Sequence, residues 1–124
     1  MESPVNHAII DEARIKLLQD TIGEKLVPII TLYFKDCSEK LDHLRALIHD
    51  DRADEVGKLA HQMKGAALSI GFVEIQNLFM ELESDAKRGH PLPHDWHSKI
   101  STALQRTRAV ISERFPESLV SGDS

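Results

Sequence analysis

A histidine with a lysine one helical turn after it marks the part of this sequence that could do chemistry. His61 is followed by Lys64 and then by Gly65. A neutral imidazole is a nucleophile at neutral pH, a lysine supplies positive charge, and a glycine has no side chain to block access. Inside a helix, glycine costs roughly 0.5–1 kcal/mol relative to alanine. Close approach by another molecule is the simplest reason for its presence.

A helix over these residues would turn the histidine outward. Large apolar residues recur on one face at the 3.6-residue period, at Val56, Leu59, Met63, Ala66 and Ile70. At about 100° per residue, His61 points roughly 180° away from the centre of that face. The same outer side holds Lys64 and Leu68, with Gly57 and Gly65 close by. An ordinary solvent-facing histidine on an amphipathic helix is the alternative, and spacing alone leaves it open.

The residues around His61 resemble the signature of a known family. The run is Ala60-His61-x-x-Lys64-Gly65-Ala66-Ala67-x-x-Ile70-Gly71, and the pair Leu82-Glu83 follows on the next expected helix. This pattern resembles that of histidine-containing phosphotransfer (HPt) domains of two-component phosphorelays, over about residues 10–88. The resemblance implies that His61 carries a phosphoryl group, that Lys64 neutralises it, and that Gly65 leaves room for it.

The chain as a whole is predicted to form helices joined by short turns. Apolar residues recur at helical spacing from residue 11 to Gly23 and over about residues 24–49, 53–69, 72–88 and 94–114. Asp11 and Asp51 are the expected caps at the start of the first and third segments. Because no strand-like alternation occurs, we expect an all-α fold. The expected architecture is an antiparallel up-and-down four-helix bundle with an additional short N-terminal helix. HPt domains have the same bundle architecture.

Length, charge and cysteine content limit the possible functions. The 124 residues suffice for a single domain, residues 1–124, with a leader at 1–9 and a flexible tail at 117–124. The formal charge of −5 disfavours a nucleic-acid partner or an anionic membrane surface. The single cysteine, Cys37, fits a reducing compartment and lies on an apolar helix face, so we expect it in the core. Without a membrane span or signal-peptide pattern, a cytoplasmic, free-standing carrier is expected.

Glu83 is the candidate for positioning the imidazole. Phosphoryl transfer depends mostly on positioning and charge stabilisation. One ring nitrogen must keep an exposed lone pair, while the other holds its proton against an acceptor. Glu83 falls roughly 70° from the core centre of its helix, on a flank that could face the helix of His61. A solvated surface carboxylate is the alternative. We therefore predict three catalytic residues, which are His61, Lys64 and Glu83.

The sequence contains no machinery for binding ATP. It has neither a glycine-rich phosphate loop nor an aspartate-rich metal cluster, so we expect a phosphocarrier and not an enzyme, with no cofactor. The resemblance implies two kinds of partner: response-regulator receiver domains, which bring their own aspartate and Mg²⁺, and a sensor (hybrid) histidine kinase. The expected docking contacts are Gly65, Gln62 and Leu68. A monomer is expected, because the site needs one domain only.

The sequence leaves two alternative functions open. His90, His94 and His97 form a cluster that could bind a metal ion. A proline-containing loop separates the first of them, however, and no cysteine completes a closed zinc site. The second alternative is a helical adaptor, which would use the same fold and docking face without any phosphate.

Overall fold

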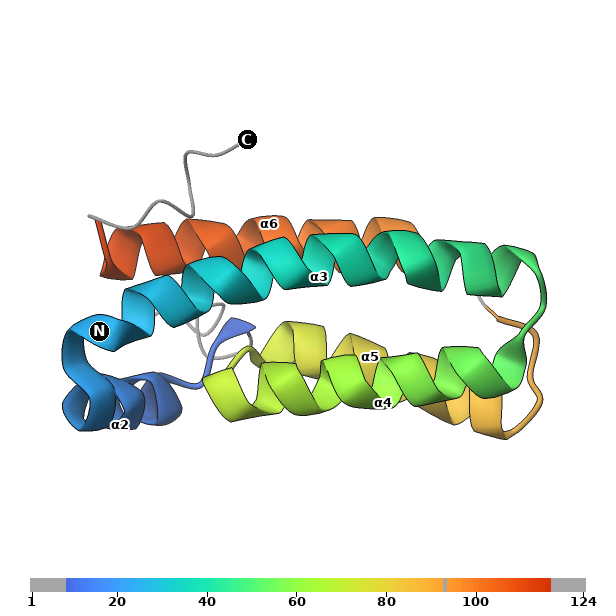
Figure 1. Cartoon of the computed structure of the whole chain (residues 1–124), viewed down its shortest axis with the longest axis horizontal. Coiled ribbons are helices and arrows are strands. Elements are labelled where there is room, and N and C mark those ends of the chain that lie inside the picture. The colour runs from blue at the N-terminus through green and yellow to red at the C-terminus, as the bar shows by residue number, and fades with distance from the viewer. Residues whose placement is uncertain (1–8, 93, 117–124) are drawn as a thin grey trace.

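The computed structural model describes residues 9–92 and 94–116, which form a bundle of helices (Figure 1). The elements are α2 (Glu12–Ile22), a 3-10 helix (Gly23–Lys25), α3 (Leu26–His49), α4 (Ala53–Ile70), α5 (Val73–Lys87) and α6 (Trp96–Arg114). Helices α3 to α6 run alternately in opposite directions, and α2 lies at the end of the bundle where α4 ends. The predicted four-helix bundle with a short additional helix is confirmed. None of the described helices is long and apolar enough to cross a membrane.

The ends of the helices follow local signals, with one exception. Asp11 caps α2, and its carboxylate accepts a hydrogen bond from the Arg14 amide at 3.1 Å. Gly71 ends α4 at φ 85°, in the left-handed region that glycine adopts without strain. The prediction that Asp51 caps α4 is wrong, because Arg52 precedes the helix and makes no side-chain cap bond. Asp51 instead lies in the turn at φ 56°, a conformation that aspartate tolerates better than most residues.

The buried face of α4 differs from the predicted one. Its buried residues are Val56, Gly57, Ala60, Met63, Ala67 and Ile70. Leu59 is only half-buried and Ala66 is exposed. The small buried residues let α4 approach α5 closely: a Cβ atom at Gly57 would lie 3.5 Å from the Cβ of Ala86. Gly57, which the sequence places close to the outer side, is therefore part of the buried face, since counting only large apolar residues misplaced the centre of that face.

The N-terminal segment is joined to the bundle where α4 ends. The Asp11 amide donates a hydrogen bond to the Gly71 carbonyl at 2.8 Å. Ile9, the first described residue, is buried in the core. The remaining residues of the predicted leader (1–9), and the whole predicted tail (117–124), lie outside the described residues.

The pairing of α4 with α5 creates the candidate site. The two helices are antiparallel neighbours joined by the short turn at Gly71. His61 on α4 and Glu83 on α5 lie at similar distances along the chain on either side of that turn. Antiparallel packing therefore places the two residues next to each other.

Candidate functional site

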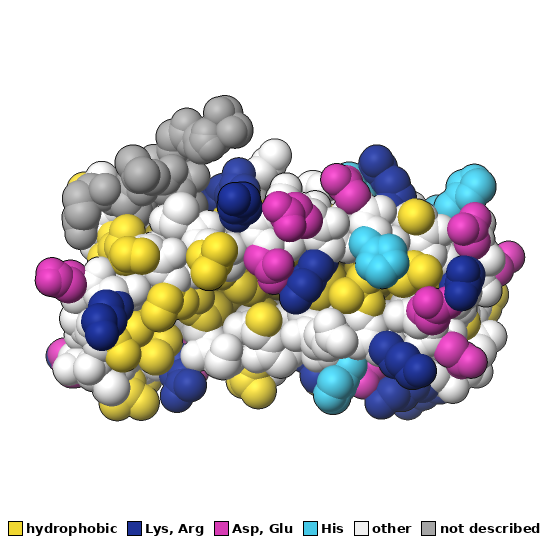
Figure 2. All heavy atoms as spheres, viewed as in Figure 1, with side chains coloured by type: hydrophobic (Ala, Val, Ile, Leu, Met, Phe, Trp, Pro, Cys, Tyr) yellow, Lys and Arg dark blue, Asp and Glu magenta, His cyan; other side chains and the backbone are white. Residues whose placement is uncertain are grey.

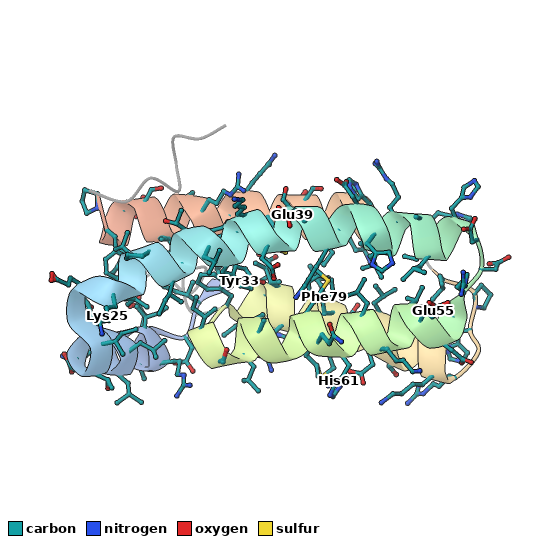
Figure 3. All side chains as sticks on the ribbon, viewed as in Figure 1. Lys25, Tyr33, Glu39, Glu55, His61 and Phe79 are labelled. Carbon is teal, nitrogen blue, oxygen red and sulfur yellow. The ribbon has the colours of Figure 1, made fainter. Side chains whose placement is uncertain are left out.

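His61 projects from the outer side of α4 into solvent (Figure 3). Its side chain is 65% exposed. The residues before and after it on the inner side, Ala60 and Met63, are buried and fix the rotation of the helix. The imidazole is thus accessible to another protein, as the sequence predicts.

Glu83 holds one nitrogen of this imidazole. Its side chain is only 5% exposed, and Oε2 lies 2.9 Å from Nδ1 of His61. An ionised carboxylate can only accept hydrogen bonds, so Nδ1 carries the proton and donates it. The other ring nitrogen, Nε2, then keeps its lone pair. The contact selects the tautomer whose nucleophilic nitrogen is Nε2.

Two lysines compensate the negative charge of the buried Glu83 carboxylate. Lys64 Nζ lies 2.7 Å from Oε1 of Glu83, and Lys87 Nζ lies 2.7 Å from Oε2. The first lysine approaches from α4 and the second from α5, one turn after Glu83 itself. The structure therefore brings the predicted residues His61, Lys64 and Glu83 together, and it adds a residue that the sequence analysis missed. The i, i+4 spacing of Glu83 and Lys87 was a signal that could have identified the pair.

The hydrogen bonds from these neighbours keep Glu83 ionised. The bond from Lys64, followed by the one from Lys87, lowers the pKa of Glu83 from 4.5 to about 2. Burial acts in the opposite direction and raises this pKa, while the hydrogen bond with His61 lowers it. The lysines outweigh the cost of desolvation, because charge-assisted hydrogen bonds favour the charged form. At any physiological pH, the imidazole therefore faces a carboxylate anion.

This pKa predicts a loss of stability in acid. The pKa of Glu83 is about 2 in the folded chain against an ordinary 4.5, so its stabilising contribution is complete above the ordinary value. The contribution disappears as the pH falls from about 5 to about 2, which lowers the free energy of unfolding by at most about 3 kcal/mol. Urea unfolding between pH 2 and 7 measures this loss.

Two glutamine variants isolate the contribution of Glu83. The Glu83→Gln variant should lose that part of the acid dependence, because glutamine does not titrate. Glu81→Gln changes an exposed residue of the same helix and should keep the dependence. Parallel stability curves for the wild type and Glu83→Gln would contradict the prediction.

The surface beside His61 is open. Gly65, one turn after His61, is exposed, and a Cβ atom built there would have no neighbour within 4 Å. Gln62 is exposed, and Leu68 is 56% exposed. Lys64 is more enclosed than predicted, at 25%, because it leans toward Glu83. The predicted docking residues thus share an accessible strip of α4 with the imidazole.

An apolar surface lies next to this strip. Exposed apolar side chains gather over α2 and the first half of α3, on the left of Figure 2. They include Leu17, Ile29 and Leu32. A groove of about 540 Å³ lies between α2, α3 and α4, where Ala66 and Ser69 form part of its wall. Isolated exposed apolar residues are ordinary, whereas a cluster of them marks a contact surface.

The other groups considered from the sequence lie away from this site. In the described part of the chain, no three His, Cys, Asp or Glu side chains come together in a way that could hold a metal ion. The alternative of a metal site at His90, His94 and His97 therefore gains no support. Cys37 is buried, as predicted, and burial raises the pKa of its thiol to about 11, which makes it a poor nucleophile.

Comparisons with known proteins point to one family. A family model described as Hpt domain matches residues 28–110 of the chain. The phosphorelay protein LuxU of Vibrio cholerae serotype O1 is 35% identical over 83 residues, which make up 64% of this chain and 72% of LuxU. No solved structure matches the chain. The range matched by the family model contains His61, Lys64, Gly65 and Glu83.

Proposed function

Because this chain belongs to the Hpt domain family and is a phosphorelay intermediate between receiver domains, we propose that its phosphoryl group is carried on Nε2 of His61. The observation that supports this most is the pair formed by His61 and Glu83. An exposed imidazole has one nitrogen 2.9 Å from a buried carboxylate, which leaves the other nitrogen free to react. A solvated histidine without a role would not need such a partner.

The proposed transfer is a displacement at phosphorus. The lone pair of Nε2 attacks the phosphorus of a receiver's aspartyl phosphate, and an N–P bond forms as the P–O bond breaks. The electron pair of the broken bond returns to the aspartate carboxylate. The proton stays on Nδ1, so the ring becomes positively charged, and the adjacent carboxylate of Glu83 stabilises this charge. The reverse displacement by a second receiver's aspartate unloads the carrier.

Lys64 is proposed to stabilise the charge of the phosphoryl group. A phosphoryl group bears nearly two negative charges at pH 7, and Lys64 lies one helical turn from His61, within reach of its outer side. Gly65 leaves the space through which the receiver's loops approach. We also propose that Mg²⁺ acts only on the receiver and that the chain needs no cofactor of its own.

The proposed docking face consists of the open strip of α4 and the apolar surface beside it. Gly65, Gln62 and Leu68 provide the strip, and the exposed residues of α2 and α3 extend it. Small, transient interfaces of this kind suit a carrier that must release each partner. The family implies response-regulator receiver domains and a kinase as partners. We propose that the chain itself is a monomeric phosphocarrier of the cytoplasm without catalytic turnover of its own.

Transfer from a labelled receiver domain tests this proposal. The chain is incubated with a receiver whose aspartate carries a ³²P phosphoryl group, and the labelled peptide is then identified. We expect an acid-labile, base-stable label, as an N–P bond requires, on the peptide that contains His61. A chain that binds the receiver without taking up label would instead be the helical adaptor, and label on another histidine would overturn the assignment.

A further inference from the structure

We propose that Lys87 is a positioning residue, which holds Glu83 against His61 and leaves Lys64 free to move to the phosphoryl group. This inference rests on the proposed phosphorylation of His61 and extends it. The family comparison assigns no role to Lys87. Its place in the site comes from the contacts of the Glu83 carboxylate alone.

The two oxygens of Glu83 have different partners. Oε1 lies 2.7 Å from Lys64 Nζ. Oε2 is shared by Lys87 Nζ at 2.7 Å and Nδ1 of His61 at 2.9 Å. Lys87 therefore binds the same oxygen that orients the imidazole, and it does so from within α5, one turn from Glu83. That bond does not depend on how α4 and α5 move relative to each other.

The charges show why a second lysine is needed. Before transfer, Glu83 faces two ammonium groups and the neutral His61, so the cluster has one surplus positive charge. The arriving phosphoryl group brings nearly two negative charges. If Lys64 were the only lysine on Glu83, its movement to the phosphoryl group would leave the buried carboxylate with the phosphorylated imidazole as its one cationic partner, and removing a partner from a buried charge is strongly unfavourable. With Lys87 in place, Glu83 stays compensated after Lys64 has moved.

The two lysines reach Glu83 from different helices, as this division requires. Lys64 is 25% exposed and belongs to the helix of His61, beside the path of the phosphoryl group. Lys87 is 67% exposed and reaches back over Glu83 from α5. It lines a groove of about 580 Å³ that also contains Lys58 and His61. Lys58 forms no ion pair or hydrogen bond with a described acidic side chain, Glu83 included, so it provides a matched control.

The test compares Lys87→Met with Lys58→Met. Both variants remove one positive charge from the same groove. We expect Lys87→Met to slow transfer from a phosphorylated receiver by about tenfold, because the imidazole and Lys64 are no longer positioned independently. Lys58→Met should change transfer less than twofold, and Lys87→Arg should restore most of the rate. In ¹³C NMR titrations, Lys87→Met should also raise the pKa of Glu83 above its value of about 2.

A double variant tests directly whether Lys64 and Lys87 have these separate roles. If Lys64 is held on Glu83 whenever Lys87 is missing, adding Lys64→Met to Lys87→Met should slow transfer less than Lys64→Met alone does. Equal rates for Lys87→Met and Lys58→Met, or losses that simply multiply in the double variant, would overturn the inference. These outcomes are distinct from failure of the proposed function, in which label would remain after replacement of His61.

Discussion

With glutamine in place of His61, the chain is expected to take up no phosphoryl label above background from a phosphorylated receiver domain. The glutamine amide can still donate a hydrogen bond to Glu83, but its nitrogen has no available lone pair and cannot attack phosphorus. Because the side chain of His61 is 65% exposed, the free energy of unfolding should change by less than about 1 kcal/mol. Label uptake and chemical unfolding, measured on the same preparation, separate lost chemistry from lost folding.

His90 provides a demanding control for this experiment. Its Nδ1 lies 3.4 Å from Oδ1 of Asp85, so it too is an exposed histidine beside a carboxylate. Asp85 is more exposed than Glu83, and no described lysine pairs with it. We expect His90→Gln to take up label like the wild type. Retained labelling in His61→Gln, or loss of labelling in His90→Gln, would show that His61 is not the phosphorylated residue.

The fold could be predicted because its signals are local. Apolar residues at the helical period, a capping Asp11 and a left-handed Gly71 define helices whose short connections permit little besides an antiparallel bundle. The rotation of α4 was harder to predict. It depends on Gly57 and the small residues near it, which large-residue counting ignores and which let α5 approach. The wrong cap at Asp51 has a different cause, because a cap depends on the exact first residue of the helix.

For the site, too, the positions of residues within one helix could be predicted, whereas the contacts between two helices could not. His61, Lys64 and Gly65 belong to one helix, so their relative positions follow from helical geometry. The approach of Glu83 depends on the packing of a second helix, and the sequence could indicate only that it lies on a flank. Its near-complete burial could not be inferred from the sequence. The contact with Lys87 was missed because an i, i+4 pair on a helix is usually a solvent-exposed pair of small effect, and only burial makes it important.

Replacing Gly65 with leucine is expected to slow transfer by at least about 100-fold while leaving the bundle folded. The reacting atoms must approach to within about 3–3.5 Å in line, and a displacement of about 1 Å is enough to cost roughly 100-fold. A leucine side chain at this exposed position would stand beside the imidazole, in the space that a receiver must enter. No atom of a neighbouring element lies within 4 Å of a Cβ built at this exposed glycine, so we expect the side chain to extend into solvent and the bundle to stay folded. Stopped-flow transfer rates and urea unfolding test the two halves of this prediction.

Alanine variants at two glycines distinguish access from helix stability. Gly57→Ala and Gly65→Ala should each stabilise the chain by about 0.5–1 kcal/mol, because alanine favours the helix and both positions have room for a methyl group. Only the substitution at Gly65 should slow transfer, and the effect should grow from alanine to leucine. If Gly65→Leu transferred as fast as Gly57→Ala, the absence of a side chain at Gly65 would have no role in access. Glycine therefore occupies a helix position where alanine would be more stable, and the approach of a partner to Nε2 of His61 accounts for that choice.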